Sequence, residues 1–180
     1  AVLAALIKCH APVVTLAVRN INRAMETVNL GRKLVRHYDT PTGLGVVELP
    51  ELRNLSNYGL IINTTPVGMT PLGQDEGSVS QEDMPVSECV LKTLAMKSYV
   101  YDAVYGCNET PLVRYCKRAG IESQDGLAML VHQGVLALEL WTGQEIPESL
   151  ITAAYQELRT VMRNKQWNES EEWAETPPVK

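Results

Sequence analysis

The sequence predicts an α/β fold, a doubly wound parallel sheet with helices on both of its faces. Strand-like and helix-like patterns alternate along the 180 residues without a repeat of fixed period, which is how parallel strands and their crossover helices follow one another. The strand candidates are short continuous apolar runs, such as VVTLAV at residues 13–18. Such runs are typical of strands that are covered on both faces.

The first half of the chain predicts two helices around the strand at 13–18. Residues 1–10, AVLAALIKCH, have the period of a buried helix, but no capping residue precedes them. A second helix carries an apolar stripe over 21–35, with Gly31 inside it at a cost of about 1 kcal/mol relative to alanine. Further strands are expected at residues 45–49, 58–65 and 98–105, and residues 67–87 have the composition of a loop.

The second half of the chain predicts three helices. Pro111 begins the first and Gly120 ends it, the usual asymmetry of proline at the start of a helix and glycine at its end. The second begins at Asp125, whose carboxylate can accept hydrogen bonds from the free N–H groups of a helix start, and Gly143 stops it. The third is amphipathic. The expected helices run over residues 111–120, 125–143 and 147–163.

Composition and charge favour a globular protein that binds neither nucleic acid nor a membrane. The chain is 45% hydrophobic and 21% charged, which is ordinary for a globular domain. The net charge of −5 offers no basic patch for nucleic acid, and the apolar runs are far shorter than a membrane span of about 20 residues. Residues 166–180 hold four Glu and one Lys and are expected to form a disordered acidic tail.

Cysteine and histidine spacing predicts neither a disulfide framework nor a metal site. The four cysteines form no C-x-x-C pair, and the three histidines lack the spacing of metal ligands. Thiols that stay reduced are typical of a cytoplasmic protein, so a cytoplasmic location is expected.

Arginines that follow the first strand point to NADP. The strand at 13–18 runs directly into Arg19 and Asn20, and Arg23 lies one turn into the next helix. In dinucleotide-binding folds an acidic residue at this strand end favours NAD, whereas arginine suits the 2′-phosphate of NADP. The alternative is two solvated surface arginines without a ligand.

The glycine-rich turn that such a fold carries between its first strand and first helix is absent. GLGVV at residues 43–47 lacks the third glycine and the following helix. The missing motif would belong just before the uncapped opening helix. We therefore expect a chain that lacks its first strand and glycine loop.

Three motifs resemble the NADP-binding C-terminal half of the shikimate 5-dehydrogenase family, which includes quinate/shikimate dehydrogenases. They are INTTPVGM at residues 62–69, YDAVYGCNETPL at 101–112 and DGLAMLVHQGVLALELWTG at 125–143. The resemblance covers roughly residues 1–147. It implies a Rossmann-like NADP-binding domain at 1–146, which a closing amphipathic helix at 147–165 follows. The acidic tail at 166–180 has no counterpart in the resemblance. Two positions depart from the family pattern, Val18 for asparagine and Cys107 for proline.

The same resemblance implies two sets of binding residues in this chain. Gln133 and Tyr105 would contact the hydroxyls of shikimate. The cofactor set comprises Arg19, Asn20 and Arg23 at the 2′-phosphate, Thr64 where the backbone passes the cofactor, and Ala103 and Gly126 at the nicotinamide. Competing interpretations are that Gln133 bonds a neighbouring loop inside the core and that Tyr105 is a packing residue. Asp102 is expected to brace the turn after its strand.

The activity that the resemblance implies is reversible hydride transfer between NADPH and 3-dehydroshikimate, a step of aromatic amino acid biosynthesis. In the family the lysine and aspartate that handle the hydroxyl proton lie in an N-terminal domain, so no catalytic residue is expected in this chain, which would be inactive alone. That domain would be its partner. The alternatives are a quinate/shikimate dehydrogenase and a non-catalytic dinucleotide-binding or regulatory module.

Overall fold

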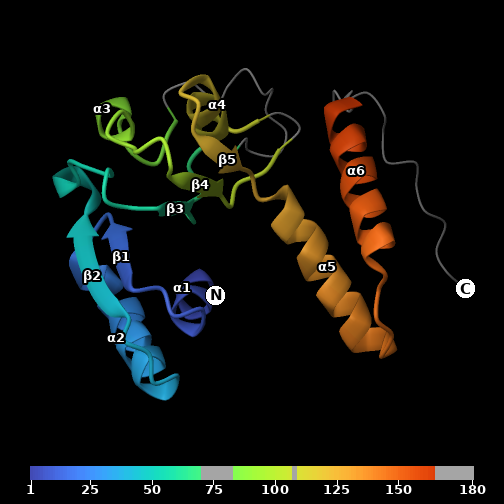
Figure 1. The fold of residues 1–180 in the computed structure, drawn as a ribbon, viewed down its shortest axis with the longest axis horizontal. Helices are drawn as coiled ribbons and strands as arrows, with labels where there is room; N and C mark the ends of the chain where they lie inside the picture. The colour runs from blue at the N-terminus through green and yellow to red at the C-terminus, as the bar shows by residue number, and fades with distance from the viewer. Residues whose placement is uncertain (70–82, 107–108, 165–180) are drawn as a thin grey trace, which may run out of the picture. The chain divides into compact units, whose positions relative to one another are not determined.

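The computed structural model describes residues 1–69, 83–106 and 109–164 (Figure 1). The chain divides into two compact units, Ala1–Asn54 and Leu55–Lys180. Each unit has its own parallel sheet, with two strands in the first and three in the second.

Unit 1 consists of two helices and a two-stranded sheet. Strands β1 and β2 pair in parallel, from Val13 opposite Gly43 to Val18 opposite Glu48. Strand β2 begins two residues earlier than predicted, because the Gly43 N–H donates to the Pro12 carbonyl at 2.9 Å and extends the ladder. The elements are α1 (Val2–Lys8), β1 (Val13–Val18), α2 (Ile21–His37), β2 (Gly43–Glu48) and the short 3-10 helix Leu49–Glu51.

Close packing explains the glycine inside α2. A Cβ atom on Gly31 would lie 3.1 Å from side-chain carbons of both Leu3 and Leu44. Alanine at this position would therefore require both leucine side chains to shift by a few tenths of an ångström. Ile7 and Val28 are buried in the same unit, and the predicted helices at 1–10 and 21–35 are confirmed.

Unit 2 is a three-stranded parallel sheet with four helices in its described residues. The strand order is β3-β4-β5, with Leu60 opposite Tyr99 and Tyr99 opposite Glu122. Val100, Leu112 and Leu127 are completely or almost completely buried. The elements are β3 (Leu60–Asn63), α3 (Glu88–Leu91), β4 (Tyr99–Asp102), α4 (Pro111–Arg118), β5 (Glu122–Gln124), α5 (Leu127–Thr142) and α6 (Glu148–Asn164).

Every strand pairing is parallel, which confirms the predicted α/β class. The orders β1-β2 and β3-β4-β5 match strands 2-3 and 4-5-6 of a doubly wound sheet. The described strands form two sheets, one in each unit, rather than the one sheet that the sequence predicted.

Helices α5 and α6 form an antiparallel pair at the C-terminal end of unit 2 (Figure 1). Helix α5 ends at Gly143, whose φ of 67° lies in the left-handed region that glycine adopts readily. Leu136, Leu140 and Trp141 on α5 are all more than 60% exposed. No helix within the described ranges is long and apolar enough to cross a membrane.

Candidate functional site

Each of the three strands of unit 2 is followed by its own turn, and the three turns have the same type of hydrogen bond. Asn63 ends β3, Asp102 ends β4, and Asp125 directly follows β5. The side-chain Oδ1 of each accepts from the backbone N–H two residues further on, at 3.0, 3.2 and 3.2 Å respectively. These are Asx turns, in which a short polar side chain replaces a backbone acceptor.

The middle residues of the three Asx turns are Thr64, Ala103 and Gly126, all of which the sequence assigned to the cofactor. Thr64 is exposed, Ala103 is half-buried and Gly126 is buried. Because parallel strands end at the same edge of a sheet, the three turns belong to the carboxyl edge of β3-β4-β5, where ligands of such sheets bind.

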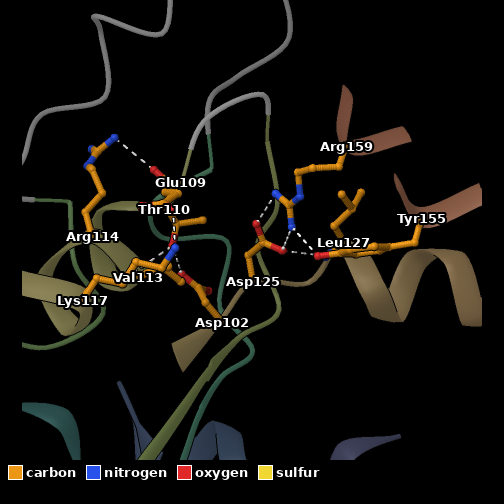
Figure 2. Close-up of polar contacts among 10 residues, drawn as sticks. All are labelled: Asp102, Glu109, Thr110, Val113, Arg114, Lys117, Asp125, Leu127, Tyr155 and Arg159. Carbon is orange, nitrogen blue, oxygen red and sulfur yellow. Dashed lines mark hydrogen bonds and ion pairs between the residues drawn. The ribbon is translucent and has the colours of Figure 1, made fainter. Parts of the chain in front are cut away.

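Asn63 and Asp102 join the first two turns through a buried network. The Asn63 amide Nδ2 donates to Asp102 Oδ1 at 2.8 Å. The Thr110 hydroxyl donates to Asp102 Oδ2 at 2.6 Å (Figure 2). Thr110 in turn accepts from the Val113 N–H at the start of α4. The network therefore ties the ends of β3 and β4 to the beginning of a helix, and it confirms that Asp102 braces the turn that follows its strand.

Asp102 is 1% exposed, and this burial raises the pKa of its carboxyl group. The hydrogen bonds from Thr110 and Asn63 oppose the shift because they stabilise the charged form. With its oxygens occupied by three donors, Asp102 is a structural group.

Gly126 lies directly against the backbone of Ala103. A Cβ atom on Gly126 would be 2.2 Å from the Ala103 carbonyl oxygen and 2.7 Å from its carbonyl carbon. The Gly126 N–H donates to the Val104 carbonyl at 3.0 Å. The structure thus brings together the two residues assigned to the nicotinamide, and only glycine fits at this position.

Asp125 forms a buried ion pair with Arg159 of α6. Two nitrogens of the guanidinium reach the two carboxylate oxygens, each at 2.7 Å (Figure 2). The side chains of Asp125 and Arg159 are 4% and 18% exposed. The hydrogen bonds to Asp125 raise the pKa of Arg159 further above its already high value. Helix α5 itself begins at Leu127, two residues later than predicted.

The two residues assigned to shikimate are both exposed. Gln133 lies on α5, and no hydrogen bond of its side chain is found among the described residues. Among the described residues, the side chain of Gln133 therefore has no contact of the kind that the competing interpretation, a bond to a neighbouring loop inside the core, requires. Tyr105 is 39% exposed and lies three residues after the end of β4.

In unit 1 the residues assigned to the 2′-phosphate surround the N-terminus of α2. Asn20 caps this helix, accepting from the Arg23 N–H at 3.1 Å. The Ile21 N–H donates to Glu48 Oε1 at 3.2 Å. Arg19 and Arg23 are exposed. Asn20 therefore has a structural role that the sequence did not assign, and the two guanidinium groups are accessible to an anion.

Sequence reasoning missed three residues of this site. Asn63 and Thr110 lie inside the motifs but were given no role, although an Asn or Asp at the end of an apolar run is a recognisable sign of an Asx turn. Arg159 carried no signal, because its partner Asp125 is 34 residues away. No metal-binding group of His, Cys, Asp and Glu occurs in the described part of the chain, and Cys107 lies outside it.

Residues 126–154 match the family model of the shikimate 5′-dehydrogenase C-terminal domain. The NADP(+) shikimate dehydrogenase of Microcystis aeruginosa is 40% identical over 105 residues, which cover 58% of this chain and 34% of that protein. The NADP(+) shikimate dehydrogenase of Magnetococcus marinus is 35% identical over 156 residues, 84% of this chain and 48% of that protein. This chain thus spans less than half the length of either relative.

The crystal structure of shikimate dehydrogenase 1 from Peptoclostridium difficile is similar to this chain, with a TM-score of 0.55 and 28% identity over 66% of this chain and 40% of that one. The likeness confirms the Rossmann-like fold. The family model begins at Gly126, the middle residue of the third Asx turn, and extends through Gln133. By this match, the two relatives and the shared fold, the chain is similar to the shikimate dehydrogenase family.

Proposed function

We propose that this chain is the cofactor-binding part of an NADP-dependent shikimate dehydrogenase, which transfers a hydride between NADPH and 3-dehydroshikimate. The row of three Asx turns carries the proposal, because the middle residue of each is one that the family resemblance assigns to the cofactor. Both curated relatives are named as NADP(+) shikimate dehydrogenases, and a family assignment alone would not fix the function.

In this proposal the backbone of unit 2 orients the nicotinamide. Asx turns fix the backbone at Thr64, Ala103 and Gly126, and a fixed surface holds a planar ring without the loss of side-chain entropy. NADPH supplies the hydride, and the protein provides binding and orientation. Gln133 and Tyr105, both exposed, would then bind the hydroxyls of the substrate.

The preference for NADP rests on unit 1. The N-terminus of α2, a helix of 17 residues, carries the partial positive charge that attracts anions. Arg19 and Arg23 add two exposed guanidinium groups beside it, and arginine binds phosphate through charge-assisted hydrogen bonds. We therefore assign the 2′-phosphate of NADP to this helix start.

Cofactor binding tests the phosphate assignment. Arg19→Ala should weaken NADP+ binding by about 1.5–3 kcal/mol, the range of one hydrogen bond to a charged group, and should leave NAD+ binding almost unchanged. Arg32→Ala is the matched control, since Arg32 is an exposed arginine of the same helix that hydrogen-bonds Asn29. Titration calorimetry on all three proteins gives the result. Equal losses for NADP+ and NAD+ would contradict the assignment.

Steady-state kinetics tests the substrate assignment. In the protein at its native length, Gln133→Ala should raise the KM for shikimate more than the KM for NADP+, because only the substrate loses a hydrogen bond. His132→Ala, the exposed neighbour on α5, should change neither value. A wild-type protein without shikimate-dependent NADP+ reduction would refute the enzyme proposal, and activity with quinate instead would favour the quinate/shikimate alternative.

Two further predictions belong to the proposal. Cys9, Cys89 and Cys116 are free thiols, which supports a cytoplasmic location.

The division into a cofactor domain at 1–146, a closing helix at 147–165 and a tail at 166–180 stays a prediction, as does the N-terminal catalytic domain. The tail lies outside the described residues. The intact mass of the native protein, compared with the 19.9 kDa of this chain, tests for the additional domain.

A further inference from the structure

The ion pair between Arg159 and Asp125 stands apart from the other charged contacts. Two more ion pairs occur in the described residues, and both are exposed: Glu88 with Lys92 in and beside α3, and Glu109 with Lys117 of α4. Exposed ion pairs contribute little to the free energy of folding. The Arg159–Asp125 pair is bidentate and mostly withdrawn from solvent, so the geometry of the carboxylate is fixed by the guanidinium fork.

Asp125 transmits this constraint to Gly126. Oδ1 of Asp125 accepts from Arg159 at 2.7 Å and from the Leu127 N–H at 3.2 Å. Gly126 is the residue enclosed between Asp125 and that N–H. Its own N–H is held by the Val104 carbonyl. The peptide groups on both sides of Gly126 are therefore anchored. The one before it is held by Val104 in the turn after β4, and the one after it is held by Asp125, which Arg159 of α6 fixes.

Helix α6 supplies a second hydrogen bond that orients the arginine. The Arg159 guanidinium donates to the Tyr155 hydroxyl at 3.0 Å, and its central carbon lies 5.5 Å from the centre of the Tyr155 ring. Figure 2 shows Tyr155 and Arg159 extending together from α6 toward Asp125. The guanidinium is thus positioned within its own helix before it reaches the turn.

We propose that Arg159 is a positioning residue for the nicotinamide end of the cofactor, acting through Asp125 on the Gly126 turn. This inference rests on the proposed function, in which Gly126 lies against the nicotinamide. It assigns to α6 a role beyond covering α5, because docking of α6 and the fit of the nicotinamide depend on the same carboxylate. The adenosine half of the cofactor, assigned to unit 1, should not depend on Arg159.

The test measures separately how the protein binds the nicotinamide half and the adenosine half of the cofactor. NADPH reports on the nicotinamide through its fluorescence emission, and adenosine 2′,5′-bisphosphate carries only the half with the 2′-phosphate. Both ligands are titrated into the protein at its native length, as wild type, Arg159→Leu, Arg159→Lys and Arg118→Leu. Arg118 is an exposed arginine in the last turn of α4 and serves as the matched control.

We expect Arg159→Leu to weaken NADPH binding about tenfold, in the range seen for residues that couple to a site through others, and to reduce the change in its emission. The affinity for adenosine 2′,5′-bisphosphate should stay within about twofold of wild type. Arg159→Lys keeps the positive charge but not the two-pronged guanidinium group, so its affinity for NADPH should lie between those of wild type and Arg159→Leu. Arg118→Leu should match wild type.

The outcomes distinguish the two proposals. Equal weakening of both ligands, or a loss of thermal stability with NADPH binding and emission unchanged, would mean that Arg159 is merely structural and would overturn this inference. A wild-type protein that binds neither ligand would refute the proposed function itself. Arg159→Leu leaves a buried carboxylate without its partner, so where this variant does not fold, the same comparison on Arg159→Lys and Tyr155→Phe decides.

Discussion

Gly126→Ala tests whether the close approach of the third Asx turn to Ala103, in the Asx turn after β4, is required. The new Cβ would lie 2.2 Å from the Ala103 carbonyl oxygen, whereas ordinary contact begins at 3.4 Å, so the turn would have to withdraw by 1.2 Å. Both obstacles are backbone atoms, which cannot rotate away. Overpacking of this kind costs about 1–3 kcal/mol, and loss of the 3.0 Å bond from the Gly126 N–H to Val104 adds about 1 kcal/mol.

We therefore expect Gly126→Ala to lower the free energy of unfolding by about 2–4 kcal/mol, measured by urea denaturation. Gly134→Ala is the matched control on the same helix: a Cβ there meets nothing within 4 Å. Alanine in a helix interior is favoured over glycine by about 0.5–1 kcal/mol, so the control should be more stable than wild type. A Gly126→Ala protein within about 0.5 kcal/mol of wild type would refute the argument from close approach.

The other Asx turns and the buried carboxylate give two more predictions. Asn63→Ala removes the acceptor of one turn and a donor to Asp102, and should lower the free energy of unfolding by about 1–3 kcal/mol. Thr64→Ala, in the middle of the same turn and exposed, should stay within about 0.5 kcal/mol of wild type; equal losses in the two urea titrations would argue against the Asx turn as the stabilising element. Burial raises the pKa of Asp102 above 3.8, so the folded state binds this proton more tightly than the unfolded chain does and loses stability as the pH rises from 3.8 through the raised pKa. Relative to Asp102→Asn, wild type should become less stable across that window and show no further change above it; the opposite slope would mean that the hydrogen bonds outweigh burial.

Most of the fold follows from local patterns in the sequence. The run at 13–18 is a strand over all six residues, and the helix between Pro111 and Gly120 is found as α4. Strand β5 was missed because its residues, Glu122–Gln124, are polar and only three in number. Its existence depends on pairing with β4, and a tertiary contact of that kind leaves no periodic pattern in the sequence.

Some residues of the site could be assigned from sequence motifs, whereas the roles of others are seen only in the structure. Ala103 and Gly126 were assigned from separate motifs 23 positions apart, and the structure brings their backbones into contact. By contrast, the motif assigned Asn20 to the cofactor but gave no sign that this side chain also caps α2. Polar residues at a helix start serve both purposes: they cap the free N–H groups of the first turn, and they lie where a phosphate would bind. A sequence pattern alone does not separate the two roles.

The three Asx turns explain why the predicted cofactor residues of unit 2, Thr64, Ala103 and Gly126, share no side-chain chemistry. The polar side chain that ends each strand is buried and structural, as Asn63 and Asp102 are at 4% and 1% exposure. The following residue contributes its backbone. Its side chain is then limited by space alone, which is open at Thr64 and closed at Gly126. If these turns bind the cofactor as proposed, the sign of such a surface in a sequence is the Asn or Asp that anchors each turn, and the adjacent residue is identified by its position alone.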